Sequence, residues 1–402
     1  MKIEKIRVKN FKVFRDMEIR NLSSFCVFLG ANGSGKSTLF DIFGFLSDAL
    51  NSNIRTALNK RGGFREVYSR EGEGAIEFEI KFRNEVHGKS KSPLITYELH
   101  INQKNHAPIV TKEVLSYRRG NYGRPYRFLD FANGTGTAIV NEEGFETEKQ
   151  EFKEERESQT LASPDILAIK GLGQFKKFKA IASFRHILES WYVSNFKVDA
   201  AQATEDAAYS EHLSVTGNNL AQVTKFIYET YPEIFHQILE KMTRRIPGIE
   251  AVSSQETLDG RIVLQFKDGS FKDPFISRFV SDGTIKMFAY LVLLHDPTPH
   301  PLLCVEEPEN FLHPELLPEL VEEFREYAAK GGQVLVSTHS PELVNALELN
   351  EVFWLTKQRG CTSIHAAEEN QEVKALVESG DKLGWLWYQG YLQGSGIQSQ
   401  SF

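Results

Sequence analysis

The residues best suited to do chemistry lie in a glycine-rich loop, GANGSGKS, at positions 30–37. The loop matches G-x-x-x-x-G-K-[ST] and stands between a short apolar run, FCVFL, and a stretch with apolar residues at helical spacing. Glycines let backbone N–H groups curl around phosphate oxygens, and a helix that starts near Gly35 points its positive end at the same anion. We therefore predict that this loop holds the phosphates of ATP. The expected binding residues are Asn32, Gly33, Ser34, Gly35, Lys36, Ser37 and Thr38.

Two of these side chains have more specific expected roles. Lys36 should reach the β- and γ-phosphates, which places it among the catalytic residues, and the Ser37 hydroxyl should coordinate Mg²⁺. The alternative is a glycine turn that binds nothing, and the strand, loop and helix context disfavours it.

An acidic pair ends the next informative stretch, PLLCVEEPEN, at residues 301–310. An apolar strand that ends in carboxylates is the usual partner of such a loop. Glu306 takes the position of the metal-side acid, and Glu307 that of the general base that orients the attacking water. Pro308 is expected to restrict Glu307 to an extended backbone. For the decapeptide alone, an ordinary charged strand end is the alternative.

Two weaker signals follow the same logic. SDGT precedes an apolar helix and places Ser281 and Gly283 at a helix N-terminus, where a second anion could bind. VLVSTHSPEL ends an apolar strand at His339, whose imidazole could donate to a γ-phosphate. Taken alone, Ser281 reads more readily as an ordinary N-cap and His339 as a structural histidine.

The elements that would position these residues show an α/β pattern. Residues 2–29 and 74–141 read as strands, the latter as an antiparallel sheet, whereas residues 164–246 have helical spacing. From residue 248 strands alternate with helices, which predicts a parallel sheet with ligand sites at the strands' carboxyl ends. We divide the chain into an N-terminal half of the head at 1–145, an inserted helical lobe at 146–247 that begins with an acidic stretch, and a C-terminal half of the head at 248–402.

Composition narrows the class of protein. A hydrophobic fraction of 41% and a charged fraction of 25% are those of a soluble globular chain, and the net charge of -7 argues against attraction of the whole protein to nucleic acid. Cys26, Cys304 and Cys361 lack ligand-like spacing, which favours a reducing compartment. The start lacks a signal peptide, and the longest apolar run is too short to cross a bilayer. We expect a cytoplasmic protein without a membrane partner.

With these motifs in view, the chain resembles the ABC-class ATPases grouped with SMC, RecF and OLD proteins, and specifically their compact AAA-type members. The resemblance rests on residues near both ends: IRVKNFKVFRDMEIRNLSSFCVFLGANGSGKSTLFD, FVSDGTIKMFAYLVLL, LLCVEEPENFLHPELLPEL and VLVSTHSPEL. It implies an ABC-type P-loop head, a mixed sheet with an antiparallel β lobe, that carries a mainly helical insertion.

The resemblance also implies roles and partners. Ser281 and Gly283 belong to the signature motif, Glu309 and Asn310 to the D-loop, and His339 is the switch histidine. Such ATPases dimerise around ATP, so a homodimer is expected, with higher order left open. The interval from Ser37 to Ser281 is too short for SMC-length arms, and the sequence after His339 is too short for the Toprim nuclease domain of OLD proteins.

The biological hypotheses follow from that implied family. The leading one is an ATP-hydrolysing switch that senses nucleic acid or a foreign component and controls a separate effector, as in prokaryotic antiphage systems. A RecF-like genome-maintenance factor is the second, and it should prefer DNA ends or gaps. A transporter's nucleotide-binding subunit is the third, and the long insertion and the EEPEN form argue against it.

Partner surfaces are less specific in the sequence. YRRGNYGRPYRF at 117–128 mixes arginine with tyrosine, and the stretch at 170–179 adds lysines, so DNA or RNA binding is a hypothesis. Solvated faces are the favoured alternative, and binding without salt dependence would contradict nucleic-acid contact. Aromatic residues at 385–391 are expected to dock on the domain, with partner binding as the alternative.

Overall fold

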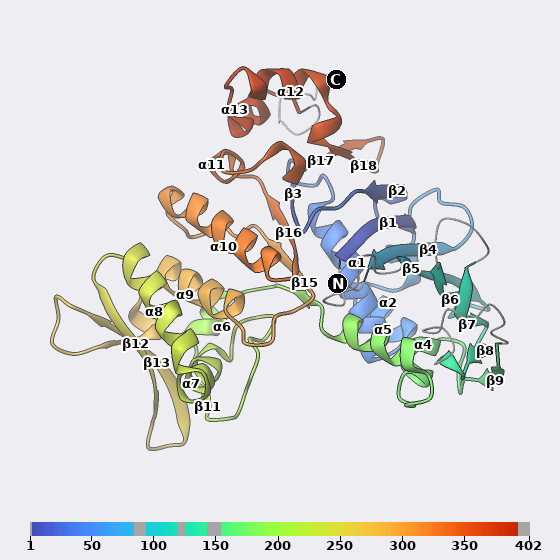
Figure 1. Ribbon diagram of the computed structural model, residues 1–402, viewed down its shortest axis with the longest axis horizontal. Coiled ribbons are helices and arrows are strands. Elements are labelled where there is room, and N and C mark those ends of the chain that lie inside the picture. The colour runs from blue at the N-terminus through green and yellow to red at the C-terminus, as the bar shows by residue number, and fades with distance from the viewer. Residues whose placement is uncertain (1, 84–93, 119–124, 143–153, 393–402) are drawn as a thin grey trace. The chain divides into compact units, whose positions relative to one another are not determined.

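The computed structural model describes residues 2–83, 94–118, 125–142 and 154–392. Within them the chain forms two compact units, each described by itself (Figure 1). Unit 1 comprises Met1–Trp191, Leu349–Asp381 and Leu386–Phe402, and unit 2 comprises Tyr192–Glu348 and Lys382–Trp385. The three-segment division expected from the sequence stays a prediction.

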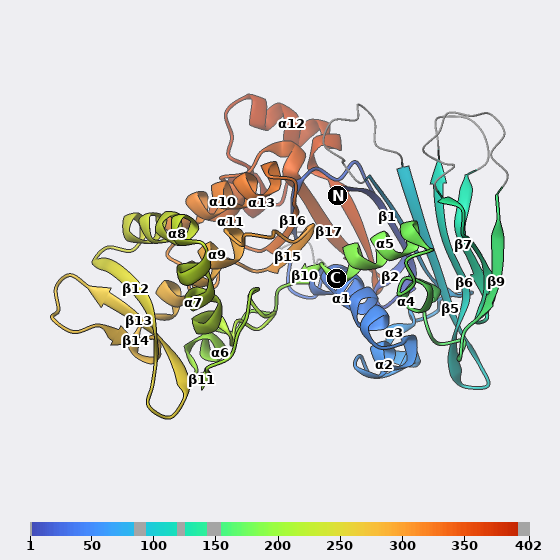
Figure 2. The same ribbon diagram turned by 60° about the horizontal axis from the view of Figure 1, so that its bottom comes forward.

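An eight-stranded antiparallel sheet dominates unit 1, in the order β2-β1-β4-β5-β6-β7-β8-β9 (Figure 2). Its inner strands alternate buried and half-buried residues, as β4 does from Ile76 to Arg83, which matches a sheet with one face on the core. This confirms the antiparallel sheet expected over 74–141. The strands are β1 (Lys2–Phe11), β2 (Phe14–Arg20), β4 (Ile76–Arg83), β5 (Leu94–Lys104), β6 (Ala107–Arg118), β7 (Tyr126–Ala132), β8 (Thr135–Ile139) and β9 (Arg156–Thr160).

Phenylalanine rings hold the helices of unit 1 on this sheet. Phe11 and Phe78 pack on Phe45 of the first helix at ring-centroid distances of 5.6 and 5.5 Å. Phe82 stacks on Phe184 at 5.0 Å. Fully burying each such ring contributes about 1.5–3 kcal/mol, so the sheet fixes the helix that follows the glycine loop. The helices are α1 (Lys36–Asn51), α2 (Ile54–Asn59), α3 (Phe64–Val67), α4 (Ala168–Leu172) and α5 (Lys179–Glu189).

A small parallel pairing in unit 1 carries the glycine loop. The fully buried strand β3 (Phe25–Leu29) pairs in parallel with β17 (Val352–Gln358), and β17 pairs with β18 (Cys361–Ala366) in antiparallel register. The ends of the sequence therefore meet in one layer, since Phe28 stacks on Phe353 at 5.3 Å. Between and after these elements lie η4 (Leu349–Glu351), η5 (Ala367–Glu369), α12 (Gln371–Glu378) and α13 (Leu383–Tyr388).

Unit 2 combines two sheets with the later part of the helical stretch expected at 164–246, whereas α4 and α5 of that stretch belong to unit 1. β10 (Tyr192–Val193), β15 (Leu302–Glu306) and β16 (Gln333–Thr338) pair in parallel. A second, antiparallel sheet consists of β11 (Glu205–Asp206), β12 (Ile249–Glu256), β13 (Arg261–Asp268) and β14 (Phe275–Ile276). The helices are α6 (Val198–Gln202), α7 (Leu220–Thr230), α8 (Pro232–Arg245), η2 (Ser277–Phe279), α9 (Asp282–Leu294), η3 (Pro314–Leu316), α10 (Leu317–Ala329) and α11 (Pro341–Val344).

A buried charge network fixes α8 against α10 in unit 2. Glu323 accepts from Lys241 at 2.7 Å and from Arg245 at 2.6 Å, and its side chain is only 3% exposed. A carboxylate buried this deeply is tolerated because both cations satisfy it. None of the helices among the described residues combines the length and apolarity needed to span a bilayer.

A second buried carboxylate, Glu113 on β6, caps helix α4 in unit 1. It accepts from the backbone N–H groups of Ala168 at 2.5 Å and Ile169 at 3.0 Å, and from the Tyr97 hydroxyl at 3.2 Å. Burial raises the pKa of Glu113 to about 7, although these donors pull it down. Glu113 therefore binds its proton more tightly in the folded chain than in the unfolded one.

We predict that this linkage lowers the stability of unit 1 as the pH rises. The contribution is present below the unfolded pKa near 4.5 and is lost as the pH passes through about 7, a change on the order of 3 kcal/mol. The thermal midpoint of the parent should therefore fall relative to that of Glu113→Gln between pH 5 and 7. Differential scanning fluorimetry of the two proteins checks this, and a difference that stays constant or grows in favour of the parent would contradict it.

Candidate active site

Two glycines shape the loop between β3 and α1. Gly33 and Gly35 have φ angles of 77° and 108°, which lie in the left-handed region that favours glycine. Gly35 is also the N-cap residue of α1, and the Leu39 N–H donates to its carbonyl at 2.9 Å. The first N–H groups of this helix have no partner within the helix. Local sequence thus produces the phosphate-type cradle expected at residues 30–37.

Lys36 and the two serines define what the cradle offers. The buried Lys36 ammonium donates to the backbone carbonyls of Gly30 at 2.7 Å and Ala31 at 3.3 Å, and so lies along the loop. Ser37 is exposed, whereas the buried Ser34 hydroxyl has no hydrogen-bond partner among the residues that the structure describes. A cation, an exposed hydroxyl and an unsatisfied buried hydroxyl in one loop fit a ligand rich in oxygen acceptors.

A residue that sequence reasoning missed supports the loop from a distant strand. Thr362 on β18 donates its hydroxyl to the Ser34 carbonyl at 2.7 Å. A Cβ added at Gly35 would lie 3.0 Å from that hydroxyl and from Val13. Nothing local in the sequence marks Thr362, because its contact spans the length of the chain.

The acidic pair lies at the end of the buried strand β15 in unit 2. Glu306 is opposite Ser337 in the parallel register with β16, and the Glu307 N–H donates to the Ser337 carbonyl at 2.9 Å. The expectation that Pro308 keeps Glu307 extended is wrong, because the φ of Glu307 is 43°. The backbone enters the left-handed region directly after the strand, and residues held in this way concentrate at functional sites.

The Glu307 side chain lies between two polar neighbours. Its Oε1 is 3.3 Å from the Nδ1 of His339, and its Oε2 accepts from the Asn310 side-chain amide at 3.1 Å. His339 also approaches Glu309, whose Oε1 accepts from the Thr338 hydroxyl at 2.6 Å and from the His339 N–H at 3.0 Å. The acidic strand end and the histidine expected from the sequence therefore form one network.

The helix start at SDGT lies beside the segment that follows β15, residues 307–311, which we call the acidic loop. The Ser281 hydroxyl caps α9 by accepting from the Thr284 N–H at 3.4 Å, which confirms the N-cap expected from the sequence. A Cβ at Gly283 would lie 2.6 Å from the Phe311 carbonyl, so only glycine allows this approach. The helix start, Phe311 and neighbouring residues line a hollow of about 400 Å³.

Lys286 links helix α9 to the acidic loop, and the sequence analysis did not select it. Its ammonium donates to the carbonyls of Glu307 at 3.3 Å and Asn310 at 2.8 Å. Burial lowers the pKa of Lys286 to about 8, partly offset by the charges of Glu309 and Glu307. The available signal was the one lysine in the apolar helix DGTIKMFAYLVLL, since a buried charge needs partners.

Several basic residues outside the candidate site pair with acidic side chains of the same unit. Arg61 donates to Asp41 at 2.7 Å and to Asp48 at 2.8 Å and so braces α1. Of the basic clusters, Arg127 pairs with Asp130 and Lys177 with Glu157, while residues 119–124 lie outside the described residues. Cations that already have acidic partners offer less to nucleic acid.

Two further expectations concern the aromatic segment near the C-terminus and the acidic stretch before the helical lobe. Trp387 is buried, whereas Trp385, Tyr388 and Tyr391 are exposed, so the aromatic segment at 385–391 docks only in part. The acidic stretch at 146–157 lies outside the described residues up to 153, and the tail after Gly394 lies outside them entirely.

A mixed α/β chain with this glycine loop, acidic strand end and capped second helix has the fold of the SMC head domains. Residues 25–345 match the family described as "AAA domain, putative AbiEii toxin, Type IV TA system", and the chain belongs to that family. No curated protein matches the sequence.

Solved structures agree on the fold. The structure is similar to an SMC head bound to the C-winged helix domain of ScpA, with 15% identity, a TM-score of 0.57 and coverage of 91% of this chain and 98% of that one. It is also similar to the Smc head domain with an extended coiled coil bound to the C-terminal domain of ScpA from Pyrococcus furiosus. That pair has 14% identity, a TM-score of 0.51 and coverage of 94% and 99%. At these identities the likeness shows the fold alone.

The contacts of Lys286 yield a test. Lys286→Met keeps the length and the aliphatic character of the lysine stem but removes the ammonium. Two carbonyls of the acidic loop then lose this donor, which should cost roughly 1–3 kcal/mol of stability. We expect a lower thermal midpoint and faster proteolysis at 307–311 than in the control Lys330→Met, which changes an exposed lysine of the same unit. Equal or higher stability of Lys286→Met would show that the buried charge costs more than its contacts return.

Proposed function

We propose that this chain binds and hydrolyses ATP with Mg²⁺, forms a homodimer around ATP, and acts as a switch for a separate effector in prokaryotic antiphage defence. One observation carries the enzymatic part: the Glu307 carboxylate is held between His339 and Asn310 at the end of a buried strand. A carboxylate oriented on both sides is suited to position a water molecule and accept its proton.

The P-loop residues hold the phosphates in this proposal. Backbone N–H groups from Asn32 to Thr38 face the anion, aided by the positive end of α1. Lys36 exchanges its contacts with the Gly30 and Ala31 carbonyls for phosphate oxygens. This exchange is favourable because a charge-assisted bond to an anion is stronger than a bond to a neutral carbonyl.

The metal would be held by Ser37 and Glu306, which offer the oxygen donors that Mg²⁺ prefers. When bound, Mg²⁺ neutralises charge on the phosphates. Glu306 supplies its oxygen from a fixed strand end because its backbone is part of the β15 ladder. Its extra methylene relative to aspartate lengthens its reach, and metal-bound water tolerates the difference.

In this proposal the His339 imidazole donates a hydrogen bond to the γ-phosphate and so responds to its presence. Its side chain is 47% exposed, so one face of the ring is open while Nδ1 is beside Glu307 and Glu309. The contact with Glu307 couples the position of the histidine to that of the base. In this proposal a donor and a proton acceptor therefore move together when nucleotide arrives or leaves.

The dimer contact would use the signature helix. Ser281 and Gly283 begin α9, whose dipole favours an anion. Phe311 is 65% exposed beside them and lines the same hollow, and exposed aromatic residues are frequent anchors of protein interfaces. A partner's nucleotide bound at this helix start would complete the site expected from the motif.

The family description names a "putative AbiEii toxin" of a toxin–antitoxin system, and a protein of such a system acts together with a second protein. The two SMC heads are bound to domains of another protein, ScpA, and a head of this fold offers surface for such a partner. The RecF-like alternative predicts a preference for DNA ends or gaps, which gel-shift measurements would reveal. Copurification with a membrane protein would favour the transporter alternative.

We predict that Glu307→Gln retains ATP, accumulates as a dimer in ATP and loses hydrolysis by about 10²- to 10⁴-fold. The reason is that an amide keeps the hydrogen bond to Asn310 but accepts no proton from water. Phosphate release and size-exclusion chromatography measure the two effects.

Two variants complete that design. Lys36→Ala should lose nucleotide binding altogether, whereas Glu315→Gln, at an exposed glutamate nearby, should behave like the parent. Hydrolysis by Glu307→Gln at the parental rate would show that Glu307 is not the base.

The effector is tested separately, by copurification with tagged Glu307→Gln, Lys36→Ala and parent chains from the native host. We expect a protein encoded beside this chain to be recovered either with the ATP-retaining Glu307→Gln chain or with the nucleotide-free Lys36→Ala chain, but not with both. Recovery of the same proteins with all three chains would contradict a nucleotide-controlled effector while leaving the ATPase assignment intact.

A further inference from the structure

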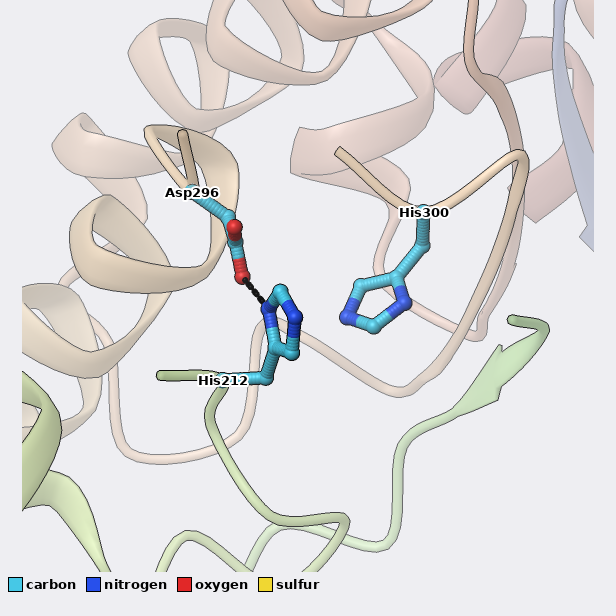
Figure 3. Close-up of side chains that lie close together, drawn as sticks. All are labelled: His212, Asp296 and His300. Carbon is cyan, nitrogen blue, oxygen red and sulfur yellow. Dashed lines mark hydrogen bonds and ion pairs between the residues drawn. The ribbon is translucent and has the colours of Figure 1, made fainter. Parts of the chain in front are cut away.

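Three potential metal ligands meet in unit 2, apart from the residues assigned to nucleotide. Figure 3 shows the side chains of His212, Asp296 and His300 converging, and one ligand atom from each lies within 4.8 Å of the other two. His212 comes from the loop before α7, and the other two come from the connection between α9 and β15.

Asp296 is the buried member of the group. Its side chain is 3% exposed, and its Oδ2 is 2.8 Å from the Nδ1 of His212. Its Oδ1 accepts from the backbone N–H of Thr298 at 2.9 Å and from the Thr298 hydroxyl at 3.3 Å. These two bonds hold Oδ1 and thereby orient Oδ2 toward His212, as hydrogen bonds from outer-shell residues orient the ligands of protein metal sites.

Both histidines are also positioned by their surroundings. The His300 ring lies against Tyr192 with centroids 5.0 Å apart, and the Tyr327 hydroxyl donates to the His300 carbonyl at 2.9 Å. The Asn219 amide donates to the His212 carbonyl at 2.9 Å. Two rings and a carboxylate are therefore presented from braced backbone.

We propose that His212, Asp296 and His300 bind a divalent transition-metal ion, with zinc as the best match. Two imidazoles and one carboxylate suit zinc and leave a fourth position for water. Magnesium and calcium prefer oxygen ligands throughout. The ion would take the place of the hydrogen bond between His212 and Asp296, because both atoms of that bond are potential ligands.

The spacing is compatible with this ion after a small adjustment. Tetrahedral bonds of about 2.0–2.1 Å place ligand atoms roughly 3.3 Å apart, so the widest separation here must close. The His212 side chain is 44% exposed and has room to rotate, whereas Asp296 is fixed. The ion would then tie the loop before α7 to the connection that leads into β15.

The test uses the full chain, stripped with a chelator and reloaded with Zn²⁺. We expect one zinc per chain by mass spectrometry of the metal, a zinc-dependent rise in thermal midpoint, and tetrahedral absorption bands with Co²⁺. His212→Ala and His300→Ala should weaken binding by more than the about 10- to 100-fold that an outer-shell change costs. Thr298→Val, which removes a hydroxyl that contacts Asp296 and His212 but is no proposed ligand, should have a smaller effect.

The matched control is His236→Ala, which removes an exposed histidine of α8 in the same unit and should bind zinc like the parent. Because His212 is exposed, its variant should keep the fold, which circular dichroism in chelator verifies. Failure of the parent to take up zinc, or parental affinity in both His212→Ala and His300→Ala, would overturn the proposal. Excess Mg²⁺ that displaces the zinc would overturn the assignment of the metal class.

Discussion

The acidic loop of unit 2 depends on one constraint: its backbone must turn sharply after β15 while its side chains stay at fixed places. It does so through two left-handed residues, Glu307 and Phe311, at φ angles of 43° and 70°. Such positions cost of order 1–3 kcal/mol each and persist only where the surroundings over-determine them. Lys286 of α9 holds the loop through its hydrogen bond to the Asn310 carbonyl, and Gly283 permits the close approach of helix and loop. Helix α9 and the loop after β15 are therefore held together as one rigid element.

Buried charge serves the same purpose elsewhere in the molecule. Glu323 fixes α8 on α10 through two cations, and Glu113 fixes the start of α4 through backbone donors. Each arrangement is stable only when complete, because an unpaired buried charge is expensive. These residues specify how helices meet, whereas the burial of the apolar core supplies the hydrophobic stabilisation. Charge therefore defines geometry in regions that apolar packing alone would leave free to slide.

Sequence reasoning predicted what is local and missed what is not. The P-loop could be predicted because its glycines, lysine and following helix are contiguous, and the Ser281 cap because an N-cap is a local signal. Thr362 could not, since its contact with the Ser34 carbonyl joins residues far apart in sequence. The φ of Glu307 was missed for a different reason. The residue before proline is biased toward extended backbone, yet tertiary contacts from Lys286 and Ser337 override that bias.

The proposed metal triad and the acidic pair flank the same strand, β15. His300 precedes Leu302, where the strand begins, and Glu306 ends it. A five-residue strand spans about 17 Å at roughly 3.3 Å per residue, so the proposed metal does not contact Glu307 directly. Coupling over that distance needs an element with two discrete arrangements, and β15 pairs on both sides in parallel register. The proposed metal would therefore brace the fold of unit 2 and leave the backbone of the loop that Lys286 contacts unchanged.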